Sequence, residues 1–336
     1  MTGLLRIRGR IELAQFWPKG SSDADTSKVK VSVDADSFAF AANGKTFRKT
    51  TVFKNASVIG ASRKPVIDKN NKVTVRLQGI DAPELHYKAA PLKGNRPGVS
   101  ATKRQAYNDV NDERRQFWSE SATVALAKKL AQYGSSTIAC EVVSFVDAPK
   151  EVVDTYGRII GNVRVGRGFS TDINLWLARE GWAFPTFYSS MTTEEIEALL
   201  AAMKTGKKKG RVWAAYSGKT NRFRKSLLYR RSGPIDAAGD RQSPVLMPKI
   251  YRRQVGYEME KAANVFRGSF KEFLERSPDQ CFETKEFIRS GVHVAQTRQL
   301  ADFLDGATFE RQPQELVFKE KFSTVVRPNG KEIEHF

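Results

Sequence analysis

The sequence predicts an α+β fold, because strand-like and helix-like segments occur together in its first half. Residues 7–17 and 28–33 alternate between apolar and polar side chains, as half-buried strands do. Residues 112–132 carry apolar side chains along one helical stripe, and Gly134 follows as a typical helix stop. Residues 137–146 are apolar and rich in β-branched side chains, which again predicts a strand.

A carboxylate-rich turn follows the strand expected over residues 73–80. Val73, Val75 and Leu77 supply its apolar positions, and Asp81 and Glu84 come directly after it. Pro83 fixes its own φ angle and favours an extended residue before it, so the two acidic side chains should point in defined directions. An edge strand with a solvated acidic turn would give the same pattern.

Two acidic turns precede this strand. The first is Asp23-Ala24-Asp25-Thr26 and the second is Asp34-Ala35-Asp36-Ser37, which comes before the strand-like residues 38–40. Both patterns are also common in ordinary polar hairpin turns.

A third polar turn, Asp154-Thr155-Tyr156-Gly157-Arg158, comes before an apolar run. Residues 172–180 then predict a short helix that stops at Gly181, and residues 192–210 predict a longer one.

Taken in chain order, Arg76-x4-Asp81-x-Pro83-Glu84 and the turn ending at Arg158 resemble the motifs of the staphylococcal-nuclease-like, or thermonuclease, family. The resemblance covers about residues 7–217 and implies a five-stranded OB-fold β-barrel with three helices. Residues from about 40 to 72 exceed what the family places there and are interpreted as an insertion. Residues 1–217 are therefore expected to form the nuclease-like domain.

The resemblance also implies a metal site. It assigns Asp81 and the main-chain carbonyl of Ala82 as ligands, together with one aspartate from the earlier turns. We favour Asp25 over Asp36, because Thr26 keeps the family residue and the strand after it alternates more cleanly. Such hard oxygen ligands suit Ca²⁺, with Mg²⁺ and Mn²⁺ left open.

The same resemblance assigns the remaining site residues. Glu84 would activate a water molecule, and Arg76 and Arg158 would clamp the phosphate. Tyr156 is expected to contact the nucleotide, and the other two pocket positions fall at Phe187 and Tyr188. His86 is more typical of a surface side chain than of a ligand.

Residues 218–336 resemble no family that we recognise. They begin with a basic linker, and an amphipathic helix follows over about residues 255–273, with a second over about 283–304. A hairpin across Asn329-Gly330 is expected near the end. We expect an accessory domain that packs on the barrel, with recognition of a protein partner as the alternative.

Composition points to a polyanionic partner. The chain has 56 lysines and arginines against 37 acidic residues, for a formal net charge of +19. Nucleic acid is favoured over a membrane, because no long apolar or amphipathic segment accompanies the charge. Cys140 and Cys281 lie far apart, which argues against a disulfide framework or a zinc site. No signal peptide is evident, so a cytoplasmic protein is expected.

Together these features predict a metal-dependent nuclease of low sequence specificity that acts on DNA, with RNA as an open alternative. The rival interpretation is a nucleic-acid-binding module that keeps the barrel but has lost its chemistry. A third class is a structural or interaction protein that acts through its C-terminal domain, and no residue pattern favours it.

Overall fold

The computed structural model describes eleven stretches of the chain. They are residues 4–16, 33–43, 51–59, 65–92, 96–145, 148–216, 239–241, 244–276, 278–291, 296–306 and 308–335. The basic linker and Asp25 lie outside these residues.

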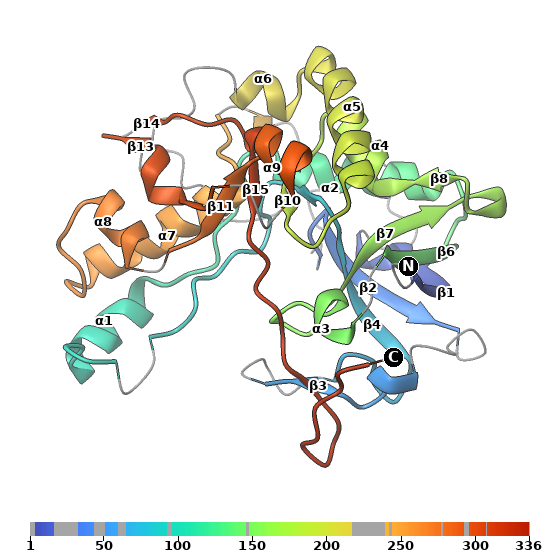
Figure 1. Ribbon diagram of the computed structural model, residues 1–336, viewed down its shortest axis with the longest axis horizontal. Helices are drawn as coiled ribbons and strands as arrows, with labels where there is room; N and C mark the ends of the chain where they lie inside the picture. The colour runs from blue at the N-terminus through green and yellow to red at the C-terminus, as the bar shows by residue number, and fades with distance from the viewer. Residues whose placement is uncertain are drawn as a thin grey trace.

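A closed β-barrel forms the centre of the molecule (Figure 1). Its five strands are β1 (Leu4–Glu12), β2 (Ser37–Ala42), β4 (Lys72–Leu77), β6 (Thr137–Phe145) and β7 (Ile159–Val165). The hydrogen-bonded order is β4-β2-β1-β6-β7, and a parallel pairing of β4 with β7 closes the barrel. The short strand β8 (Thr171–Asp172) pairs antiparallel with β7 at the edge of this sheet. The expected five-stranded OB-like barrel is thus confirmed.

Alternating side chains explain why these strands close on one core. Every second residue of β7 is buried, beginning with Ile159, and β4 follows the same pattern from Val73. A period of two places these apolar side chains on one face of the sheet, which becomes the barrel interior. Among the described residues, Phe38 and Phe40 of β2 are 1% exposed and lie in this core.

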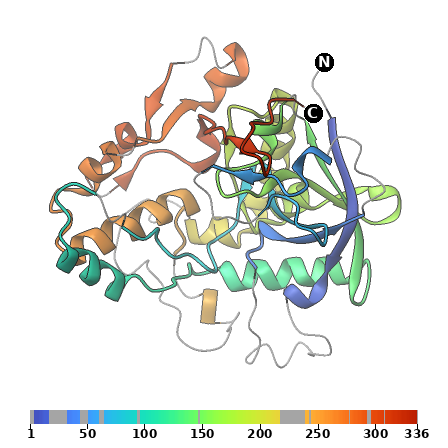
Figure 2. The ribbon, with the colours of Figure 1, turned by 90° about the horizontal axis from the view of Figure 1, so that it is seen from below.

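The described residues before 217 contain more helices than the three expected. Those before residue 217 are α1 (Ala101–Val110), α2 (Ser119–Ala131), α3 (Pro149–Val152), α4 (Ile173–Glu180), α5 (Thr193–Lys209) and α6 (Val212–Tyr216). The helix expected from residue 112 begins at Ser119, after an irregular segment. α2 packs its apolar stripe, including Leu126 and Leu130, on the barrel core (Figure 2). No helix in the described part of the chain is long and apolar enough to span a membrane.

The C-terminal region contains strands as well as helices. Its helices are α7 (Pro248–Ala262), α8 (Phe270–Glu275) and α9 (Thr284–Ser290), and its strands are β11 (Gln280–Glu283), β12 (Arg298–Gln299), β13 (Leu304–Asp305), β14 (Thr308–Phe309), β15 (Leu316–Phe318) and β16 (Val325–Val326). The helix expected over 283–304 is confirmed only as α9, because residues 298–303 form β12 and η8 instead, and residues 292–295 lie outside the described residues. Gly291, with φ of 71°, ends α9, and β12 follows.

Short elements complete the described chain. The remaining strands are β3 (Ser57–Val58), β5 (Ile80–Asp81), β9 (Phe184–Pro185) and β10 (Phe187–Tyr188). Turns of 3₁₀ helix are η1 (Leu13–Gln15), η4 (Thr51–Phe53), η5 (Arg167–Phe169), η7 (Gly239–Arg241), η8 (Leu300–Phe303) and η9 (Pro313–Glu315).

C-terminal strands pair with strands of the nuclease-like part. β15 pairs in parallel with β10, and β16 pairs antiparallel with β3, which lies in the expected insertion. Phe282 and Val317 belong to the same apolar cluster as the barrel core. In Figure 1 the last segment runs from β15 along the barrel to β3. The end of the chain turns back at Gly330, where Val326 bridges Glu332, so the expected hairpin is confirmed.

Asp240 in η7 is fully buried, and its Oδ2 accepts a hydrogen bond from the Ser121 amide at 2.9 Å. Burial raises its pKa from 3.8 to about 7. Between pH 3.8 and about 7 the folded protein keeps a proton on Asp240 that the unfolded chain has lost. The contribution of Asp240 to the free energy of unfolding therefore falls as the pH rises through this range. Asp240→Asn keeps an oxygen acceptor and cannot ionise, so it should melt above wild type at pH 8 and near wild type at pH 5. Equal melting temperatures at pH 8 would contradict this assignment.

Candidate active site

The strand β4 and the turn after it place one cation and one anion at an end of the barrel. Arg76 lies on β4 and Asp81 on β5, and Gly79 between them has φ of 74°, which favours glycine. β5 pairs with β9, which holds Asp81 in a fully buried position. Arg76 Nη2 lies 3.4 Å from Asp81 Oδ1.

The turn at residues 34–36 fixes the acidic loop from the other side. Asp34 Oδ1 accepts hydrogen bonds from the amides of Leu85 at 3.0 Å and His86 at 3.2 Å. Asp36 Oδ2 accepts one from the Ala82 amide at 3.0 Å. The second acidic turn therefore lies at the site, whereas Asp25, the ligand favoured from the sequence, lies outside the described residues.

Asp36 and Asp81 form a buried pair of carboxyl groups. Burial, reinforced by the nearby charges of Asp81 and Glu84, raises the pKa of Asp36 to about 7. Burial alone would also raise the pKa of Asp81, but Arg252 and Arg76 hold it below its ordinary value. The pair thus combines an ionised carboxylate with a neighbour that loses its proton near neutral pH.

Glu84 is held through its main chain. Its amide donates to Gln116 Oε1 at 3.0 Å, and its carbonyl accepts from the Gln116 amide at 2.7 Å. Burial raises the pKa of the Glu84 carboxyl to about 7, with Asp34 and Asp81 adding to the effect. The group therefore exchanges a proton near neutral pH.

Arg158 and Tyr156 come from the turn before β7. The Asp154 carboxylate accepts from the amides of both residues at 2.9 Å and from Arg158 Nε at 2.7 Å. Gly157 allows this tight turn through its φ of 84°. Arg158 Nη1 reaches Ser37 Oγ at 3.4 Å, and Ser37 pairs with Arg76 across β2 and β4. Both arginines therefore lie beside the acidic pair.

The three expected nucleotide contacts differ in accessibility. Tyr156 is 73% exposed, and the Arg158 guanidinium carbon lies 5.3 Å from its ring centroid. Tyr188 is half-buried, and Lys249 Nζ lies 5.5 Å from its ring centroid. Phe187 is fully buried within the core, so its ring has no face open to a nucleotide, and we leave it out of the site.

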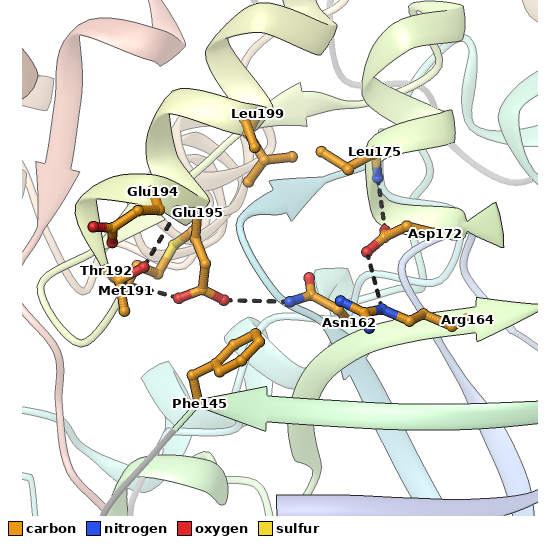
Figure 3. A pocket seen from close by; sticks show the side chains of 11 residues that line it. Phe145, Asn162, Arg164, Asp172, Leu175, Met191, Thr192, Glu194, Glu195 and Leu199 are labelled. Atoms are coloured by element: carbon orange, nitrogen blue, oxygen red, sulfur yellow. Dashed lines mark hydrogen bonds and ion pairs between the residues drawn. The ribbon is translucent and has the colours of Figure 1, made fainter. Parts of the chain in front are cut away.

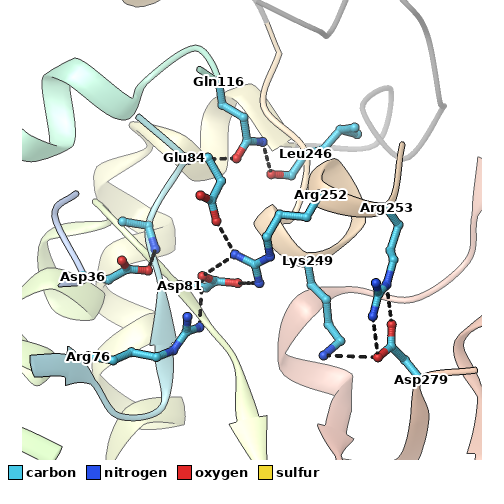
Figure 4. Close-up of polar contacts among 11 residues, drawn as sticks. Asp36, Arg76, Asp81, Glu84, Gln116, Leu246, Lys249, Arg252, Arg253 and Asp279 are labelled. Atoms are coloured by element: carbon cyan, nitrogen blue, oxygen red, sulfur yellow. Dashed lines mark hydrogen bonds and ion pairs between the residues drawn. The ribbon is translucent and has the colours of Figure 1, made fainter. Parts of the chain in front are cut away.

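A guanidinium from the C-terminal region also enters the site (Figure 4). Arg252 lies on α7, and its Nη1 and Nη2 contact Asp81 Oδ1 at 3.2 Å and Asp81 Oδ2 at 2.9 Å. Nη1 also contacts Glu84 Oε1. Its side chain is 22% exposed. The site therefore contains three arginines and four acidic side chains, counting Asp34.

A family comparison agrees with these motifs and with the barrel that carries them. Residues 74–215 match the staphylococcal nuclease homologue family. The chain therefore carries an SNase-like domain, as the motifs indicated, and the region C-terminal to it has no family match. Among curated proteins, none matches the chain. The match supports a nuclease-type or nucleic-acid-binding module.

The matched span of the SNase-like domain includes Arg76, Asp81, Glu84 and Arg158 but neither Asp36 nor Arg252. Sequence reasoning missed Arg252 because it belongs to no motif and precedes the amphipathic helix expected from about residue 255, whereas α7 begins at Pro248. It also missed Gln116, which holds Glu84 and donates from Nε2 to the Leu246 carbonyl at 2.8 Å. The position of each depends on packing between distant segments.

The donor chemistry of the SNase-like site fits a divalent cation at Asp36 and Asp81. Two adjacent buried carboxyl groups and a main-chain carbonyl are hard oxygen donors. Burial is the main cause of the raised pKa of Asp36, and the negative charges of Asp81 and Glu84, which a cation would offset, add to it. However, no group of three or more His, Cys, Asp or Glu side chains among the described residues is arranged to hold a metal ion. Glu84 pairs instead with Arg252.

His86 is not aimed at these carboxylates. Its Nδ1 lies 3.0 Å from Glu113 Oε1, and its side chain is 16% exposed. It therefore belongs to a neighbouring hydrogen-bonded contact with Glu113.

A separate hollow of about 390 Å³ lies between β7 and the helices α4 and α5 (Figure 3). Its polar side chains are engaged in local structure. Asp172 caps α4 through the Leu175 amide at 3.0 Å. Glu195 accepts from the Thr192 amide at 3.1 Å and from Asn162 Nδ2 at 3.2 Å. This hollow supplies no catalytic constellation.

Proposed function

We propose that this chain is a divalent-cation-dependent nuclease that hydrolyses phosphodiester bonds of DNA with little sequence preference. The observation that carries the proposal is the convergence of Arg76, Asp36, Asp81 and Glu84 with Arg158 at one end of the barrel. RNA is a further substrate class that the same phosphate chemistry admits, because phosphate contacts carry little sequence information.

The arginines would bind the phosphate and stabilise the charge that develops on it. Arg76 lies on β4, and Arg158 directly precedes β7, which pairs with β4. Arg158 Nη1 contacts Ser37, the cross-strand neighbour of Arg76, so the two guanidinium groups would be placed to face one phosphate. Each offers a planar fork that donates paired charge-assisted hydrogen bonds. Donors fixed in this way contribute most where charge builds up in the transition state.

Glu84 would orient the attacking water or take its proton. Its raised pKa of about 7 matches this role, because a general base works best when its pKa lies near the working pH. Asp36, Asp81 and the Ala82 carbonyl would hold the cation, for which Ca²⁺, Mg²⁺ and Mn²⁺ are candidates. When bound, such an ion neutralises phosphate charge and favours ionisation of water.

The binding-module interpretation has one observation in its favour. Arg252 already neutralises Asp81 and Glu84, as it would in a barrel that binds nucleic acid without cleaving it. In that case the chain would bind DNA without degrading it.

A digestion assay separates the two functions. We expect the full chain to degrade plasmid and single-stranded DNA when Ca²⁺, Mg²⁺ or Mn²⁺ is present, and to lose this activity in excess chelator. Asp81→Asn is the matched control against a contaminating nuclease. DNA binding without cleavage under every cation condition would favour the binding module, and full activity in excess chelator would contradict the cation requirement.

A further inference from the structure

The most unusual feature of the site is that Arg252, from outside the SNase-like domain, contacts both oxygens of Asp81. The guanidinium also contacts Glu84, so a single positive group bridges two acids of the site. Arg76 touches Asp81 as well, at 3.4 Å. The oxygens of Asp81 are therefore surrounded by guanidinium donors rather than open to a cation.

The structure fixes α7 so that Arg252 must point here. Tyr251, the residue before it, is fully buried in a cluster with Tyr107 of α1. Arg253, the residue after it, binds Asp279 through Nε at 2.7 Å and Nη2 at 2.9 Å. The helix is thus anchored on both sides of the site-facing residue.

Two further contacts tie this part of α7 to the acidic loop. The Tyr87 hydroxyl donates to the Arg252 carbonyl at 3.3 Å. Gln116, which holds the main chain of Glu84, also donates to the Leu246 carbonyl just before α7. Figures 1 and 2 show α7 and α1 side by side next to the barrel. The placement of Arg252 is therefore built from several independent contacts.

We propose that Arg252 is an internal counter-ion that competes with the divalent cation for Asp81, so that the C-terminal region sets the cation affinity of the SNase-like site. The inference rests on the metal site of the proposed function. A guanidinium and a divalent metal ion bind the same carboxylate oxygens. A metal ion that binds Asp81 must therefore weaken or replace the contacts with Arg252. The Arg252 side chain is 22% exposed, so solvent reaches part of the guanidinium that the cation would displace.

Calorimetric titration of Mn²⁺ into the full chain tests this competition without measuring catalysis. Arg252→Gln removes the competing charge, so we expect Mn²⁺ to bind about tenfold more tightly or better, as expected when charge-assisted hydrogen bonds no longer have to be broken. Arg252→Lys keeps the positive charge without the planar guanidinium fork, so its Mn²⁺ affinity should lie between those of wild type and Arg252→Gln. Arg253→Gln is the matched control, because it removes an ion pair of the same helix that does not touch the site, and its affinity should stay within twofold of wild type.

Thermal unfolding provides the second readout. Without cation, Arg252→Gln should melt below wild type, because Asp81 and Glu84 lose a buried partner. Saturating Mn²⁺ should raise the melting temperature of Arg252→Gln by more than it raises that of wild type. If Arg252→Gln does not fold, Arg252→Lys carries the test.

The outcomes separate the inference from the proposed function. Equal or weaker Mn²⁺ binding by both Arg252 variants would overturn the competition while leaving the metal site intact. Tighter binding by Arg253→Gln to the same degree would also overturn it, because the effect would then reflect loosening of α7. Absence of Mn²⁺ binding in wild type and every variant would overturn the metal site and this inference together.

Discussion

Asp36→Asn should abolish cation-dependent DNA cleavage, whereas Asp25→Asn should retain most of it. Asp36 accepts from the Ala82 amide at 3.0 Å and lies beside Asp81, so it is the aspartate placed to share a cation with that residue. Asparagine is nearly isosteric and removes only the charge. Losing an outer-shell partner of a metal ligand costs about 10- to 100-fold, and losing a ligand should cost at least as much.

The comparison is measured as initial cleavage rate at saturating DNA, over a series of cation concentrations. Circular dichroism and thermal unfolding confirm that each variant is folded. Retained activity in Asp36→Asn with loss in Asp25→Asn would return the ligand to the first acidic turn, as the sequence analysis favoured.

Arg158→Lys should lower turnover by on the order of 10² or more, with a smaller change in DNA affinity. The Asp154 carboxylate and Ser37 hold the Arg158 fork in a fixed direction, and lysine cannot donate two parallel hydrogen bonds from one plane. Because the charge is kept, the loss should fall on the transition state rather than on binding.

Arg164→Lys is the matched control for this prediction. Arg164 lies on β7, the strand that directly follows Arg158, but its Nε faces Asp172 at 3.9 Å on the side of the separate hollow. Its turnover should stay within threefold of wild type. Similar rates for Arg158→Lys and Arg164→Lys would show that Arg158 is an ordinary surface charge.

The sequence predicted the barrel because its information is local. Alternation in β4 and β7 and the glycine turns at Gly79 and Gly157 act over a few residues, and they specify strands whose polar ends carry Arg76, Asp81 and Arg158. Glycine stops likewise predicted the end of α4 at Gly181.

The choice between two acidic turns could not be made locally. Both have the same Asp-x-Asp spacing, and what distinguishes Asp36 is its contact with the Ala82 amide, 46 residues along the chain. Arg252 is separated from Asp81 by 171 residues, and the packing of α7 on α1 and the contacts of α7 with Asp279 and Tyr87 bring it to the site. Phe187 failed as a nucleotide contact for a related reason, because pairing of β10 with β15 buries it.

Elements of the insertion and of the C-terminal region also depend on contacts between segments that are distant in the sequence. β3 and β16 are two-residue strands that exist because they pair with each other, and neither has a pattern long enough to predict. Residues 298–303 looked helical by apolar spacing, but they form β12, which pairs with β11, and the 3₁₀ turn η8, which packs against α8. Tertiary pairing decided these elements.

The most direct test of a cation site at Asp36 and Asp81 is anomalous diffraction from crystals of the full chain soaked in Mn²⁺. The account predicts a single strong anomalous peak at coordinating distance from both carboxylates and the Ala82 carbonyl, with the Arg252 guanidinium withdrawn from Asp81. The absence of a peak there, with Arg252 still bound to Asp81 and Glu84 at saturating Mn²⁺, would contradict it.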